Sequence, residues 1–269
     1  MGIVNVTPDS FSDGGKFTQA DAAVEHALTL ADQGATILDI GGESTRPYST
    51  PVAADQELER VIPVIEKLVT RTKTPISIDT SKSVVAAAAI AAGAEIINDV
   101  TGLQGDPKMI DIALQTGAGL CAMHMQGSPQ DMQNKPSYQN VTREIHSYLA
   151  QRKSALIDAG IEPDKICLDP GIGFGKTFDH NLQLIRECHR FHDLGCPILI
   201  GHSRKGFIGK LISNNSPDQS DPPSISQRDA GTLAITLKLA QQGIQVIRVH
   251  EVANTIAALK TQQELTNNG

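Results

Sequence analysis

The chain has 269 residues, of which 40% are hydrophobic, 20% charged and only 3% aromatic, and its formal net charge is −7. This composition is typical of a globular protein, and the acidic balance argues against a nucleic-acid binder, which usually presents a basic face. No apolar run approaches the roughly 20 residues that span a bilayer, so we expect no membrane contact.

One local pattern recurs along the chain: a helical run ends at a glycine, and a short β-branched run follows it. Glycine just past a helix end adopts the left-handed conformation that terminates helices. The runs that follow are continuously apolar, which favours strands buried on both faces of a parallel sheet. The pattern occurs at Gly34, Gly93, Gly117, Gly195 and Gly243.

The apolar runs predict eight strands separated by helical patterns. Eight such units in a chain of this length indicate an α/β fold, a (β/α)₈ TIM barrel that forms a single domain over residues 1–269. A doubly wound open sheet is the alternative. The predicted strands are 2–6, 36–40, 76–79, 95–100, 120–124, 166–169, 198–201 and 245–250.

Two further stretches need an interpretation. "SNNSPDQSDPPSISQ" is rich in proline, serine and asparagine, which predicts a long exposed loop between the seventh strand and its helix. "DPGIGFGKT" ends like a phosphate-binding P-loop, but that motif requires a glycine where Pro170 stands. The preceding Asp169 would also aim a carboxylate at the phosphates, so both departures weaken a P-loop reading.

The four cysteines, Cys121, Cys167, Cys188 and Cys196, form no C-x-x-C pair. Three of them lie in or beside apolar strand-like runs, which indicates buried free thiols. Free thiols fit a reducing cytoplasm, and we see no segment with the charged and apolar regions of a signal peptide. We therefore expect a cytoplasmic protein.

Polar side chains gather at the predicted carboxyl ends of all eight strands. In barrels of this type the chemistry lies on the loops at those ends, so we expect one site assembled by the whole barrel. The polar strand ends are Asn5, "GGESTRP", Asp79, Asn98 with Asp99, Met123 with His124, Asp169, "GHSRKGF", and Arg248 with His250.

The residue types suggest two subsites. Arg46, Arg248 and His250 suit an anion, because guanidinium groups match phosphate oxygens in bidentate fashion. The other set suits a planar heterocycle, because a carboxylate accepts two parallel N–H bonds while an amide and an ammonium pair with the remaining atoms. That set is Asp79, Asn98, Asp169 and Lys205.

These residues also carry a family resemblance. "MGIVNVTPDSFSDGG", "GGESTRP", "SIDTSK", "INDVTG", "MHMQG", "LDPGIGFGKT", "SRKGFIG" and "RVHEV" occur in order over almost the whole chain, and together they resemble the dihydropteroate synthase family. The resemblance implies a transferase of folate biosynthesis that condenses (7,8-dihydropterin-6-yl)methyl diphosphate with 4-aminobenzoate. It also implies Mg²⁺, a TIM barrel and a homodimer.

The resemblance assigns roles by position. Asn5 matches the metal-linked asparagine, and Ser203 lies beside the aminobenzoate. Phe11 and Pro47 lie in two mobile loops that cover that second substrate. The diphosphate and substrate contacts are Thr45, Arg46, Arg248 and His250. The pterin contacts are Asp79, Asn98, Met123, Asp169, Phe174 and Lys205.

The implied reaction is loss of diphosphate followed by attack of a neutral arylamine on a CH₂ carbon. Mg²⁺ with Arg46, Arg248 and His250 stabilises the leaving charge. Lys205 donates to the ring, and a carboxylate such as Asp79 or the loop residue Asp13 favours the developing cation. Asp79 could instead cap the helix that begins near Lys82. Three rival functions stay open: a pterin-dependent methyltransferase, a Schiff-base aldolase that uses Lys205, and a non-catalytic pterin-binding protein.

The chain departs from the family pattern at two points. Family members have residues ahead of the first strand, whereas this chain starts at Met1, so either the sequence is truncated or the barrel bottom closes differently. His202 stands where the family has a small apolar residue, and it receives no role.

Overall fold

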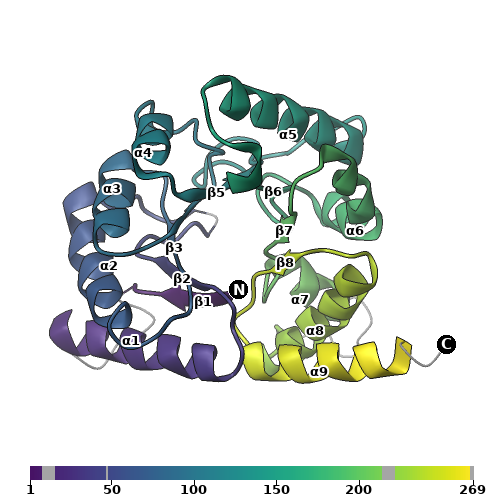
Figure 1. Cartoon of the computed structure of the whole chain (residues 1–269). Coiled ribbons are helices and arrows are strands. Elements are labelled where there is room, and N and C mark those ends of the chain that lie inside the picture. Colours follow the sequence, from purple (N-terminus) through teal and green to yellow (C-terminus); the bar gives the residue numbers. More distant parts are fainter. Residues whose placement is uncertain (8–15, 47, 214–221, 267–269) are drawn as a thin grey trace.

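The computed structural model describes residues 1–7, 16–46, 48–213 and 222–266. Within them, strands and helices alternate, and the helices surround the strands (Figure 1). The strands are β1 (Gly2–Asn5), β2 (Leu38–Gly41), β3 (Ile76–Asp79), β4 (Ile96–Asp99), β5 (Gly119–Met123), β6 (Ile166–Asp169), β7 (Leu199–Ile200) and β8 (Val246–Ile247). The helices are α1 (Lys16–Asp32), α2 (Ala54–Leu68), α3 (Ser83–Ala91), α4 (Met109–Thr116), α5 (Val141–Asp158), η2 (Pro163–Lys165), α6 (Phe178–Glu187), η3 (Cys188–Leu194), α7 (Gly206–Ser213), α8 (Ile225–Gln241) and α9 (Val252–Thr266).

The strands close into a parallel barrel. β1 to β6 pair in sequence order, and β7 pairs with β8. Two isolated bridges complete the ring: Leu168 with Ile198 joins β6 to β7, and Gly2 with Val249 joins β8 to β1. The predicted TIM barrel is therefore confirmed, although β7 and β8 are only two residues long each.

Glycine ends the helices as predicted. All five glycines of the recurring pattern have positive φ, from 63° at Gly195 to 112° at Gly93. At Gly93 a side chain would also collide, because an added Cβ would lie 2.6 Å from Val69 Cγ1. The recurring glycines thus mark helix ends where the backbone needs a positive φ, which glycine adopts without steric cost.

On β2, β3 and β4 the two faces of the strand differ in polarity. The outward-facing Leu38, Ile40 and Ile78 are fully buried beneath the helices. Alternate residues point into the barrel, and there the strands carry polar groups such as Asp39 and Asn98, which are 0% and 6% exposed. The barrel interior is therefore a polar site enclosed by an apolar shell.

The segment after β7 differs from the prediction of a single loop. Helix α7 follows β7 directly, so the proline-rich stretch lies between α7 and α8, and its residues 214–221 are outside the described part. α8 then begins with a capping box, in which the Ser224 hydroxyl accepts from Gln227 N and Gln227 Oε1 accepts from Ser224 N. The short polar side chains of that stretch supply this helix start.

The cysteines and helices agree with the remaining expectations. All four cysteines are free thiols; Cys121, Cys188 and Cys196 are buried and Cys167 is half-buried. Among the helices of the described ranges, none combines the length and apolarity needed to cross a membrane.

Candidate functional site

Arg248 lies at the centre of a charged network inside the barrel. Its Nε donates to Asp39 Oδ2 at 2.5 Å, and its Nη2 donates to Asp79 Oδ2 at 2.8 Å. Asn98 Nδ2 donates to the same oxygen of Asp39 at 3.1 Å. Residues from β2, β3, β4 and the end of β8 thus meet around one guanidinium.

The sequence analysis missed Asp39. Its side chain is fully buried, and its Oδ1 has no hydrogen-bond partner among the described residues. A carboxylate in the apolar run 36–40 was the available indication, because aspartate is almost never fully buried unless it is paired. The partner, Arg248, is 209 residues away along the chain, so the sequence could not name it.

The network changes the proton affinities of its members. Burial disfavours the charged guanidinium of Arg248, but the carboxylates of Asp39 and Asp79 outweigh burial and raise its pKa. Burial raises the pKa of Asp79 to about 7, against the lowering effect of Arg248. Asp79 is therefore poised to titrate near neutral pH. It caps no helix, because α3 begins after Lys82 without a side-chain cap.

Asp169 at the end of β6 presents one free carboxylate edge. It is 5% exposed, and its Oδ1 accepts from Gly171 N at 2.6 Å. Burial raises its pKa, whereas the positive charge of Lys205 lowers it. Its Oδ2 accepts no hydrogen bond from the described residues, so this edge is available to a ligand N–H group.

Lys205 faces Asp169 from the loop before α7. Its Nζ donates to the carbonyl of Ile172 and lies 4.3 Å from the centre of the Phe174 ring. Burial lowers the pKa of Lys205 to about 7, although Asp169 opposes the shift. Met123 from β5 is 3% exposed and lies in register with Asp169 on β6. The structure thus brings the predicted heterocycle residues to one end of the barrel.

His250 and Ser203 lie on the adjacent side. Ser203 Oγ accepts from His250 N at 3.2 Å and lies 2.9 Å from His250 Nδ1. Burial lowers the pKa of His250 to about 3, and the positive charges of Arg204, Arg248 and Arg46 act in the same direction. The imidazole is therefore neutral. The Ser203 hydroxyl occupies Nδ1, so Nε2 is the ring nitrogen that has no hydrogen-bond partner among the described residues.

The sequence and the overall fold of this chain resemble those of known proteins. Residues 1–250 match the family described as "Pterin binding enzyme". The chain belongs to the pterin-binding enzyme family. The dihydropteroate synthase of Escherichia coli K12 is 44% identical over 97% of this chain and 89% of its own length.

Two solved structures resemble this pterin-binding enzyme over 99% of its length and 92% of theirs. A Xanthomonas albilineans dihydropteroate synthase with 4-aminobenzoic acid has a TM-score of 0.90 at 47% identity. A dihydropteroate synthase from the same organism in complex with 7,8-dihydropteroate has a TM-score of 0.87 at 44% identity. Both comparisons support the barrel and its strand order.

Several predicted site residues lie at or beyond the edge of the described part. Thr45 is half-buried and Arg46 exposed in the loop between β2 and α2. Phe11, Asp13 and Pro47 fall outside the described residues. Asn5 ends β1, half-buried, and its side chain makes no hydrogen bond to the residues that the structure describes.

The lysine of the P-loop-like segment of this pterin-binding enzyme is buried and bonded within the protein. Lys176 is 2% exposed, and its Nζ donates to Phe174 O at 2.8 Å and lies 3.1 Å from His124 Nδ1. Burial lowers the pKa of both Lys176 and His124. Lys176 therefore fastens the loop after β6 to the end of β5. Sequence reasoning missed this role because the contact depends on the neighbouring strand.

The same contact explains the glycines of the segment. Gly171 has a φ of 70°, and an added Cβ would lie 1.9 Å from His124 O. Thr177 then caps α6, as its side chain accepts from His180 N at 3.2 Å. The segment is a tight connection between β6 and α6 that presses against β5.

Proposed function

We propose that the chain is a dihydropteroate synthase. It condenses (7,8-dihydropterin-6-yl)methyl diphosphate with 4-aminobenzoate and releases diphosphate and 7,8-dihydropteroate. The observation that carries this proposal is the placement of two subsites side by side. One subsite has the free edge of Asp169 facing Lys205, and the other has Arg248 and His250 with unused N–H donors.

The first subsite matches the polar edge of a pterin. The carboxylate of Asp169 accepts two parallel N–H bonds, one from the ring and one from its amino group, through the free Oδ2 and the remaining lone pair of Oδ1. Asn98 uses one Nδ2 hydrogen on Asp39, so its Oδ1 and second hydrogen remain for the ring. Lys205 donates to a ring heteroatom, and Met123 and Phe174 provide apolar contact.

The second subsite matches the leaving diphosphate. Arg248 uses two of its five N–H groups on Asp39 and Asp79, which leaves three for anionic oxygens. With Ser203 donating to Nδ1, the neutral His250 would donate through Nε2, and Arg46, whose positive charge acts on His250 from the loop after β2, would add a further guanidinium. Donors fixed before the C–O bond breaks stabilise the charge that develops on the leaving oxygen.

Asp79 lies between the two subsites. Its pKa of about 7 places it partly ionised at neutral pH, and its Oδ2 accepts from Arg248. A carboxylate beside the ring favours the positive charge that forms at the CH₂ carbon as diphosphate departs. The arylamine attacks as a neutral base, so no strong general base is required.

Magnesium is part of the proposal. Among the described residues there is no group of three His, Cys, Asp or Glu side chains that could hold a metal ion. Mg²⁺ is commonly bound through few protein oxygens together with water and substrate phosphates. The side-chain amide of Asn5, which makes no hydrogen bond within the described part of the chain, fits that role. When bound, the ion would neutralise charge on the leaving diphosphate. We further propose a cytoplasmic homodimer, in keeping with the family.

Diphosphate release in the presence of both substrates tests the function. We expect release that depends on 4-aminobenzoate and on Mg²⁺, with 7,8-dihydropteroate as the product. Absence of amine-dependent release would contradict the proposal. A borohydride-trapped adduct at Lys205 with a carbonyl substrate would instead indicate an aldolase, since a lysine with a pKa near 7 can form a Schiff base.

A further inference from the structure

The segment 202–205 after β7 makes contacts that alternate between helix α8 and the candidate site. His202 and Arg204 contact α8, whereas Ser203 contacts His250 and Lys205 contacts the Phe174 ring. Substrate binding does not explain the α8 contacts, because their partners are residues of α8 to which no substrate role is assigned.

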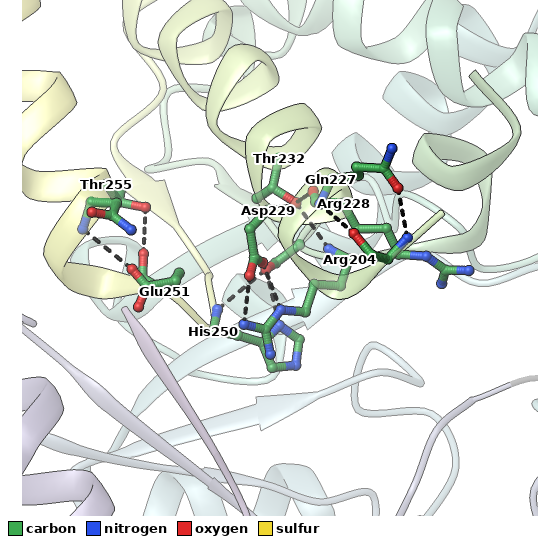
Figure 2. Close-up of polar contacts among 11 residues, drawn as sticks. Arg204, Gln227, Arg228, Asp229, Thr232, His250, Glu251 and Thr255 are labelled. Atoms are coloured by element: carbon green, nitrogen blue, oxygen red, sulfur yellow. Dashed lines mark hydrogen bonds and ion pairs between the residues drawn. The ribbon is translucent and has the colours of Figure 1, made fainter. Parts of the chain in front are cut away.

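Arg204 and Asp229 form the most specific of these contacts. Arg204 Nε lies 2.6 Å from Asp229 Oδ1, and Nη2 lies 2.9 Å from Oδ2. Figure 2 shows the carboxylate of Asp229 turned from α8 toward the guanidinium, with His250 beside the pair. The side chains are only 32% and 21% exposed. This two-bond geometry fixes orientation as well as distance.

The backbone at Arg204 needs such a restraint. Its φ is 58°, a left-handed conformation that costs a residue other than glycine about 1–2 kcal/mol. Arg204 N donates to Thr232 Oγ1 at 3.1 Å, so α8 holds both ends of the residue. The reversal at Arg204 lets Ser203 and Lys205 both turn toward the barrel.

His202 anchors the start of the same turn. It is fully buried, and its Nε2 lies 3.0 Å from Thr232 O and 3.1 Å from Thr236 Oγ1. Burial lowers the pKa of His202 to about 4, so the neutral ring donates from Nε2. A small apolar residue could not make this contact, which gives His202 a structural role.

We propose that Asp229 is a positioning residue for the reaction. Its two hydrogen bonds to Arg204, called the fork below, hold the turn 203–205 in place. In that position Lys205 contacts the pterin and Ser203 orients His250. This inference rests on the proposed function. Asp229 touches neither substrate. Its charge also offsets that of Arg204 beside His250, because the two act on the imidazole in opposite directions.

A double-mutant cycle in pterin binding tests the proposal. We expect Asp229→Ala and Arg204→Ala each to weaken binding of the bare pterin about 10-fold, since small misplacements of binding groups carry penalties of this order. The affinity of the double variant for the pterin should be no lower than that of the single variant with the lower affinity, because the two substitutions remove the same interaction. Arg204→Lys should also bind more weakly than wild type, since an ammonium cannot form the fork.

The matched control is Asp21→Ala, which removes the exposed ion pair of Lys67 with Asp21 on α2 and α1. It should leave pterin affinity unchanged. All variants are titrated at a temperature where circular dichroism shows them folded. If Asp229→Ala lowers only the melting temperature and keeps pterin affinity within twofold of wild type, the proposal is overturned; additive losses in the double variant would overturn it too. Failure of the wild type to release diphosphate would count against the function instead.

Discussion

Replacing Arg248 with methionine removes the cation that holds the centre of the site together. In the native protein Arg248 lies between Asp39, which is fully buried, and Asp79, whose side chain is 12% exposed. Methionine keeps much of the apolar stem but leaves both carboxylates without a counter-charge. We therefore expect the variant to affect folding as well as the proposed binding of diphosphate.

The structure allows the size and pH dependence of the effect to be estimated. Removing one partner of a buried ion pair costs about 3–5 kcal/mol. Burial already raises the pKa of Asp79 to about 7, and in the variant this carboxyl loses the lowering effect of Arg248, so its pKa should rise further above the unfolded value of about 3.9. The folded state then binds more protons than the unfolded state, so its stability falls as pH rises. The defect should be largest near pH 8 and should shrink toward pH 5.

Urea denaturation at pH 5 and pH 8 measures this free energy of unfolding. The control is the double variant Asp39→Asn/Arg248→Met, which removes one of the two carboxylates left without a counter-charge. It should recover part of the free energy of unfolding lost at pH 8. A free energy of unfolding within about 1 kcal/mol of wild type at both pH values would refute the reasoning, because a buried unpaired carboxylate destabilises the folded state by more than that.

Asp169→Asn should weaken binding of the pterin by roughly 2–4 kcal/mol in calorimetry, since the amide lacks the charge and can turn a donor toward a donor; affinity within threefold of wild type would remove Asp169 from the pocket. Gly171→Ala should lower the free energy of unfolding by about 3 kcal/mol or more, because its Cβ would meet the His124 carbonyl at 1.9 Å. Gly117→Ala, which has positive φ but open space around it, should lose only about 1–2 kcal/mol, and equal losses would contradict the clash. Titrated 4-aminobenzoate should bind at least ~10-fold more tightly with diphosphate and Mg²⁺ present, a coupling of about 1.4 kcal/mol; equal affinities would exclude a pocket completed by the first substrate.

The sequence by itself determined the barrel and named most residues of the candidate site. Helix-ending glycines such as Gly93 and Gly117 record a left-handed backbone that few other residues adopt, so they mark the repeat directly. Strand ends follow from the apolar runs, and in parallel barrels the chemistry collects at one end of the strands. For that reason Asp79, Asn98 and Asp169 could be placed in one site before any distance was known.

Only the tertiary structure decided which of these groups hold one another. The pairing of Arg248 with Asp39 joins residues from opposite ends of the chain, and local sequence carries no information about such a partner. The burial of Lys176 and the fork between Arg204 and Asp229 likewise depend on a neighbouring strand or helix. Burial and nearby charges set the pKa of a side chain. The near-neutral pKa values of Asp79 and Lys205 therefore exist only in the folded barrel.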